Sequence, residues 1–74
     1  MSINDLKIGQ CAIIDTIAGD TRLTKRLMAL GYTKGTKVML KTAAPLGDPV
    51  IINLRGFNLA LRKKDAKNIK VREL

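Results

Sequence analysis

One segment of the chain changes its hydrophobic period partway along. Leu23, Leu27 and Leu30 stand at i, i+4 and i+7, the spacing of an apolar stripe on one side of a helix. Gly31 follows at once, where a residue in the left-handed conformation would close the helix. Tyr32 would then pack back over Leu27. The pattern predicts a short helix that is closed by a glycine.

A strand is predicted directly after this helix. Gly35 supplies a second turn, and beyond it the hydrophobic period becomes two. Val38, Leu40 and Thr42 share one face, and the residues between them share the other. A short helix followed by an alternating strand is the arrangement expected when a helix covers one side of a strand-rich fold.

The remaining segments add more strands and tight turns. A strand is expected over 10–17, with apolar residues on both faces in its first half, so that its inward face stays ambiguous. Apolar residues alternate in three further stretches, 50–54, 57–62 and 69–72. The residues expected to point inward from them are Val50, Ile52, Leu54, Phe57, Leu59, Leu61, Ile69 and Val71. Arg55 and Gly56 fit a tight hairpin with glycine at positive φ. Residues 63–68 are long enough for one helical turn. The 74 residues thus predict a single domain that is mostly β, a small bent barrel of about five strands with one inserted helix.

Two connecting segments complete this prediction. In the opening segment, Ile3, Leu6 and Ile8 are expected to tuck under the edge of the barrel. Before the helix, Asp20 or Thr21 is suited to accept a hydrogen bond from the first free amide groups as the N-cap.

The chain is strongly basic. Lys and Arg number 14 against 6 Asp and Glu, a formal charge of +8 that attracts polyanions such as nucleic acid, anionic lipid or an acidic protein face. A basic surface is expected near the end of the chain, formed by Arg62, Lys63, Lys64, Lys67 and Lys70. Such a face has an equally simple interpretation, which is that solvated charges keep a small domain soluble.

The few aromatic residues bear on the nucleic-acid hypothesis. Proteins that bind single strands stack bases on aromatic rings, at about 1–3 kcal/mol per base. The only aromatic residues are Phe57, expected in the core, and Tyr32, expected at the helix end. No stacking platform remains in this interpretation, and no specific nucleic acid is expected. A basic barrel that binds nucleic acid stays the alternative function.

Residues suited to catalysis are scarce. The chain has no histidine, the commonest general acid-base group and metal ligand. Cys11 lies in an apolar strand and is expected to be a small buried hydrophobe rather than a nucleophile. Asp48 stands alone between Gly47 and Pro49, where a turn residue is the simpler interpretation. The expectation is a protein that is not an enzyme, with no cofactor, metal or small-molecule substrate.

The setting is expected to be cytoplasmic. The longest uninterrupted apolar run falls far short of the ~20 residues that a membrane helix needs. No basic leader with an apolar segment behind it is visible. The single cysteine, Cys11, fits a reducing compartment.

Several motifs carry a resemblance to a known family. The sequence PLGDPV at 45–50, LALRKKDA at 59–66 and IKV at 69–71 resembles FeoA, the small cytosolic component of the bacterial Feo ferrous iron uptake system. LMALGYTKG at 27–35 resembles the leucine-glycine segment of that family. Lys34 departs from the pattern, because the family often has proline before the second glycine. The resemblance covers nearly the whole chain, in the expected order.

The resemblance implies an SH3-like β-barrel that helps Fe²⁺ uptake by contact with FeoB, a membrane transporter with a cytosolic G domain. Without histidine, direct iron binding is not expected. The candidate contact surface combines the loop of Pro45, Leu46, Gly47, Asp48 and Pro49 with the turn that contains Gly31, Tyr32 and Gly35. The basic residues could in addition attract anionic lipid headgroups at the inner face of the membrane, at about 1 kcal/mol per charge.

Overall fold

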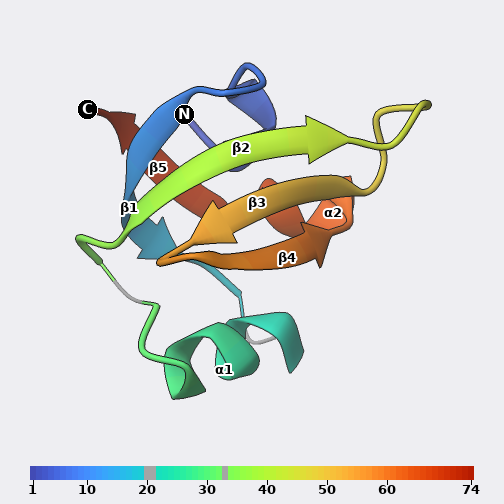
Figure 1. The fold of residues 1–74 in the computed structure, drawn as a ribbon. Coiled ribbons are helices and arrows are strands. Elements are labelled where there is room, and N and C mark those ends of the chain that lie inside the picture. Colours follow the sequence, from blue (N-terminus) through green and yellow to red (C-terminus); the bar gives the residue numbers. More distant parts are fainter. Residues whose placement is uncertain (20–21, 33) are drawn as a thin grey trace.

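Five antiparallel strands form one bent sheet in the computed structural model, which describes residues 1–19, 22–32 and 34–74 (Figure 1). The strands are β1 (Cys11–Ile17), β2 (Lys37–Ala43), β3 (Val50–Leu54), β4 (Phe57–Leu61) and β5 (Ile69–Glu73). Their order in the sheet is β4-β3-β2-β1-β5. Three short helices complete the fold: η1 (Ile3–Asp5), α1 (Arg22–Ala29) and α2 (Lys63–Ala66). The mostly β, barrel-like fold predicted from the sequence is confirmed, whereas the predicted caps Asp20 and Thr21 lie outside the described residues.

Two bulges bend the sheet. The register shifts between Ile14 and Thr16, where β1 pairs with β5, and between Leu40 and Thr42, where β2 pairs with β3. A bulge places one extra residue on one strand, which increases the local twist and resets the alternation of side chains. The prediction that Thr42 shares a face with Val38 and Leu40 is therefore wrong: Thr42 is exposed, and Ala43 packs against the core instead.

The core lies on the concave side of the sheet. The alternation predicted for residues 50–54, which form β3, is confirmed, because Val50, Ile52 and Leu54 are all buried. Leu61 from β4 and Ile69 from β5 are fully enclosed as well. Alternation in these strands is a reliable guide because one face packs against the core and the other meets solvent.

Phe57 is the main exception. The sequence places it inside, but its side chain is 69% exposed, and Leu59 is only partly buried. Because β4 is at the edge of the sheet and Phe57 is its first residue, the side chain points to the correct face but extends past the core. Ile8 is also wrongly predicted, at 68% exposed, because the chain turns away at Gly9 before β1 begins.

The predicted hairpin between β3 and β4 is confirmed. Arg55 has φ 50° and Gly56 has φ 87°, so both residues of the connection are left-handed. Two such residues form a type I′ turn, whose twist matches that of the flanking strands. The register Leu54 to Phe57 then pairs the residues on either side of this turn.

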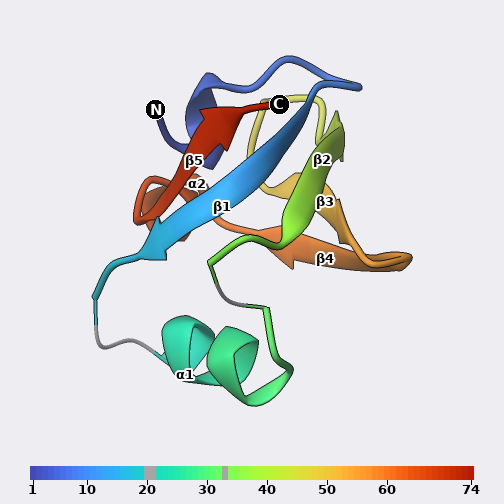
Figure 2. The ribbon, with the colours of Figure 1, turned by 90° about the vertical axis from the view of Figure 1, so that its left-hand side faces the viewer.

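Helix α1 lies across one end of the barrel, as both views show (Figures 1 and 2). Its closure by Gly31, at φ +83°, is confirmed. The Gly31 amide donates to the Met28 carbonyl at 3.0 Å and the Tyr32 amide donates to the Leu27 carbonyl at 3.0 Å, the two bonds of a Schellman motif. Leu27 and Tyr32 are buried in the same core cluster. Leu30 is 55% exposed, contrary to prediction, because it follows the last helical residue.

Replacement of Leu27 is expected to test how this helix is anchored. Leu27→Ala should lower the free energy of unfolding by about 2–5 kcal/mol, because it leaves a cavity under α1. Leu30→Ala removes the same atoms from an exposed position and should cost about 0.5 kcal/mol. Urea unfolding of the two variants measures both values. Equal losses would contradict the placement of Leu27 as the anchor.

Candidate functional site

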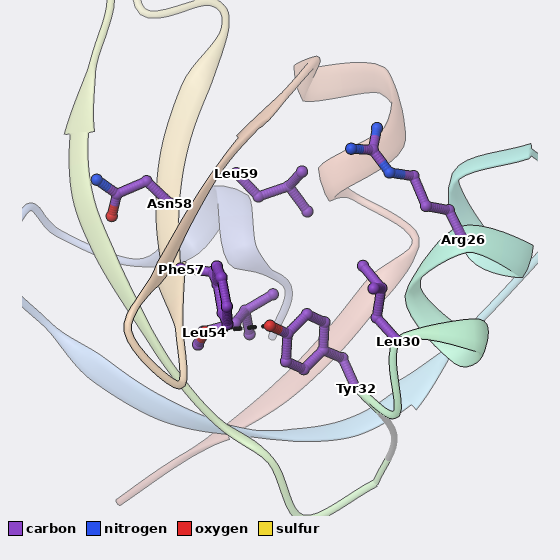
Figure 3. A pocket seen from close by; sticks show the side chains of 7 residues that line it. All are labelled: Arg26, Leu30, Tyr32, Leu54, Phe57, Asn58 and Leu59. Atoms are coloured by element: carbon purple, nitrogen blue, oxygen red, sulfur yellow. Dashed lines mark hydrogen bonds between the residues drawn. The ribbon is translucent and has the colours of Figure 1, made fainter.

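An apolar groove lies between α1 and the edge strand β4 (Figure 3). Its volume is about 160 Å³. The lining comes from α1 and the turn after it, from β3 and from β4, and consists of Arg26, Leu30, Tyr32, Leu54, Phe57, Asn58 and Leu59. The groove brings together side chains that are far apart in the sequence.

Tyr32 forms part of the wall of this groove and ties the helix end to the barrel. Its ring is buried, and its hydroxyl donates to the carbonyl oxygen of Leu54 at 3.4 Å. The guanidinium of Arg55 lies 6.0 Å from the centroid of the ring, within range of a cation–π interaction. Leu30 and Phe57 stand on opposite sides of the groove and remain largely exposed (Figure 3). The site is therefore apolar and aromatic within and has Arg26 in its lining, and Arg55 lies over the ring of Tyr32.

The outer edge of β4 borders the groove. Within the described residues, β4 pairs with β3 alone. In a two-residue hairpin the flanking pair, here Leu54 and Phe57, exchanges both backbone hydrogen bonds. The backbone groups of Asn58 and Ala60 then point away from β3. An open edge of this kind can accept an extended segment of another chain as an added strand.

The opposite end of the barrel is organised by Lys63. The Lys63 amide donates to Oδ1 of Asp48 at 3.0 Å, and Nδ2 of Asn4 donates to the Lys63 carbonyl at 2.9 Å. Asp48 thus satisfies an amide at the start of α2. It has the structural role expected of a loop residue, although its partner is 15 positions along the chain. Leu46, at the tip of the same loop, is 95% exposed.

The candidate contact residues fall into two groups. Pro45 to Pro49 follow the end of β2, whereas Gly31 to Gly35 precede its start (Figure 1). A strand of seven residues separates them by about 20 Å or more. Tyr32 is beside the groove and Gly31 is adjacent to Leu30. The candidate contact residues, which were expected to form one surface, therefore belong to two separate surfaces at opposite ends of β2.

The basic residues gather at the loop end. Arg62, Lys63, Lys64, Lys67 and Lys70 are all exposed. The first four flank or belong to α2, and Lys70 lies on β5. Through the bond between Lys63 and Asp48, α2 is next to the loop that carries Leu46. The sequence did not predict this grouping, because the two segments come together only through the fold.

The groove itself was also missed by the sequence analysis. Leu30 and Phe57 were assigned to the core because they continue the apolar period of the preceding helix and the following strand. The available signal was their position at the limits of those elements, next to Gly31 and Gly56. An apolar side chain beside a left-handed glycine turn is a candidate for exposure.

Among residues 1–19, 22–32 and 34–74, no three His, Cys, Asp or Glu residues cluster so as to hold a metal ion. Cys11 is only partly buried and is paired across the strands with Met39. No helix of the described chain is long and apolar enough to cross a membrane.

Comparison with known proteins gives a consistent result. The FeoA domain profile matches residues 1–73. A fusion of Fe²⁺ transport protein A with the Fe²⁺ transporter FeoB, from Porphyromonas gingivalis, is 32% identical over 96% of the chain, which spans 8% of that relative. The solution structure of FeoA from Chlorobium tepidum superimposes with a TM-score of 0.92 at 36% identity, over 100% of this chain and 70% of that one.

A further relative bears on the fold class. The zinc complex of FeoA from Stenotrophomonas maltophilia, described as a procaryotic SH3 domain protein, matches with a TM-score of 0.84 at 25% identity. The match covers 97% of this chain and 89% of that one. The SH3-like architecture expected from the sequence is confirmed.

The bond between Asp48 and Lys63 can be tested by its effect on α2. Asp48→Ala should cost about 1 kcal/mol, typical of a lost acceptor at a helix start, and should speed hydrogen exchange of the Lys63 amide. Asp48→Asn retains an acceptor oxygen and should leave exchange nearly unchanged. Amide exchange followed by NMR measures the effect. Equal exchange in the two variants would show that the carboxylate does not hold α2.

Proposed function

Because the chain belongs to the FeoA family, we propose that it is a non-enzymatic accessory protein of ferrous iron transport that acts by contact with the membrane transporter FeoB. The observation that carries the proposal is the fusion relative, in which a homologous FeoA segment and FeoB share one polypeptide. Linkage of two modules raises their effective concentration without any new contact. Without such linkage, the same association would depend on a binding surface of the FeoA domain.

The groove beside β4 is the better of the two surfaces for a protein partner. Aromatic residues and arginine are enriched at the centres of protein interfaces, and this groove combines Tyr32 and Phe57 with Arg26. Arg55 lies over the ring of Tyr32. An apolar side chain of FeoB would enter between Leu30 and Phe57. A carboxylate beside it would pair with an arginine, and an extended backbone would add to the open edge of β4.

The proposed role requires no chemistry from this chain. FeoB would move the iron, and the accessory protein would favour one state of the transporter by binding that state more tightly. The expected location is the cytoplasmic face of the membrane, where the G domain of FeoB is accessible.

Capture on detergent-solubilised FeoB from the same organism tests the proposal. Phe57→Ser and Leu30→Ser should each weaken binding about tenfold or more, because each removes an apolar contact at the groove. Met28→Ser is the matched control, since Met28 is 59% exposed on the same helix and outside the groove lining. Unchanged capture by both groove variants would exclude the groove as the contact.

The same experiment examines the other predicted surface and the effect of nucleotide. If Leu46→Ala and Asp48→Ala weaken capture and the groove variants do not, the loop end is the contact. Binding with and without guanine nucleotide would show whether the G domain sets the affinity. No capture of the folded protein in either state would contradict the proposed function.

The alternative function is nucleic-acid binding, and the exposed ring of Phe57 supplies one surface on which a base could stack. It remains a single ring, because Tyr32 is buried. We expect this protein to cause no mobility shift of single-stranded RNA or duplex DNA at about 50 mM salt. A protein that neutralises several phosphates would still bind and shift the nucleic acid at that salt concentration. A tight complex whose affinity falls steeply with salt would favour the alternative.

A further inference from the structure

We propose that the end of the barrel opposite α1 is a lipid-facing surface, which binds anionic membranes by inserting Leu46 and Ile8 between headgroups held by surrounding lysines. The proposal does not depend on contact with FeoB. It rests on how the fold combines two exposed aliphatic side chains with the basic residues around α2.

The two aliphatic side chains extend from the tips of neighbouring turns. Leu46 is 95% exposed and Ile8 is 68% exposed. Ile8, Gly47 and Lys63 line one shallow hollow, so both turns border the same hollow as the lysine. Both views show these turns on the side of the barrel away from α1 (Figures 1 and 2).

Hydrogen bonds hold these segments in place before any ligand arrives. The Lys63 backbone binds Asp48 of the loop and Asn4 of η1, so both segments are fixed to the first residue of α2. The Gly9 amide donates to the Leu40 carbonyl at 2.7 Å and fixes the turn that presents Ile8. A preorganised surface loses less conformational entropy on binding than a flexible one.

The charge around the two side chains is predominantly positive. Lys7 adjoins Ile8, and exposed basic residues continue along α2, namely Arg62, Lys63, Lys64 and Lys67. The carboxylates nearby are Asp5, Asp48 and Asp65. Asp48 and Asp5 accept backbone amides, from Lys63 at 3.0 Å and from Ser2 at 2.8 Å. The basic groups remain in excess, as an anionic surface requires.

The residue types favour lipid over protein as the occupant. Lysine is depleted at the centres of protein interfaces, and its hydrated ammonium suits a diffuse layer of headgroups rather than one fixed partner. Leu46 and Ile8 protrude, so a protein would need matching cavities, whereas a membrane deforms around them. Aliphatic side chains buried at the headgroup boundary, with lysines beside them, are the usual elements of interfacial binding.

Co-sedimentation with vesicles tests the surface. The protein should bind vesicles that contain phosphatidylglycerol as well as phosphatidylcholine, and it should dissociate from them as the salt concentration is raised. It should not bind vesicles of phosphatidylcholine alone. Lys64→Gln should weaken binding about fivefold, the value of one charge near the membrane. Lys37→Gln removes an exposed lysine at the start of β2, away from the proposed surface, and should weaken vesicle binding much less.

Insertion is tested separately from charge. Leu46→Ser should weaken vesicle binding roughly tenfold, whereas Met28→Ser at the α1 end should not. The chain has no tryptophan, so Leu46→Trp introduces a single fluorescent probe. Its emission should shift to the blue with anionic vesicles, and that of Met28→Trp should not.

Four results would overturn the proposal. Absence of vesicle binding at low salt would exclude the surface. Equal losses in Lys64→Gln and Lys37→Gln would show attraction by net charge alone. Binding without a shift of the probe in Leu46→Trp would exclude insertion. If Leu46→Ser instead abolished capture by solubilised FeoB and left vesicle binding intact, the surface would belong to a protein partner.

Discussion

The left-handed turn at Gly31 determines the arrangement of the α1 end of the molecule. It ends α1, and the two hydrogen bonds of the Schellman motif return Tyr32 over Leu27. The Tyr32 hydroxyl then reaches the Leu54 carbonyl, which joins the helix end to the barrel. The same turn leaves Leu30 outside. One backbone constraint therefore anchors the helix and creates a wall of the groove, which matters in a chain too small to bury a large core.

Sequence periodicity predicted the elements well and their ends poorly. Residues such as Ile52 and Val71 were placed correctly because they lie within strands whose inner faces pack against the core. Phe57 and Leu30 were misplaced because a period holds only while the backbone repeats, and each lies at the limit of an element. Thr42 was misplaced because a bulge resets the alternation. The local sequence does not predict this bulge, because its extra residue, Lys41, is of a type that also occurs in regular strands.

The candidate sites were harder to predict than the fold for the same physical reason. An exposed apolar residue breaks the rule by which the core is recognised, so the groove was hidden among residues assigned to the interior. The loop end depended on a hydrogen bond between Asp48 and Lys63, which are distant in sequence. Glycine turns were the exception: positive φ is a local requirement, and Gly31 and Gly56 were predicted to have it and do.

The two ends of the barrel differ in chemistry, and β2 keeps them apart. The α1 end offers aromatic rings, arginines and an open strand edge, whereas the loop end offers Leu46, Ile8 and lysines. A protein that holds a membrane by one end and a transporter by the other needs only modest affinity at each. Attachment to the membrane confines the search for the transporter to a surface, and the second contact then forms at high effective concentration. On the two proposals, this division lets a small domain act on a much larger partner.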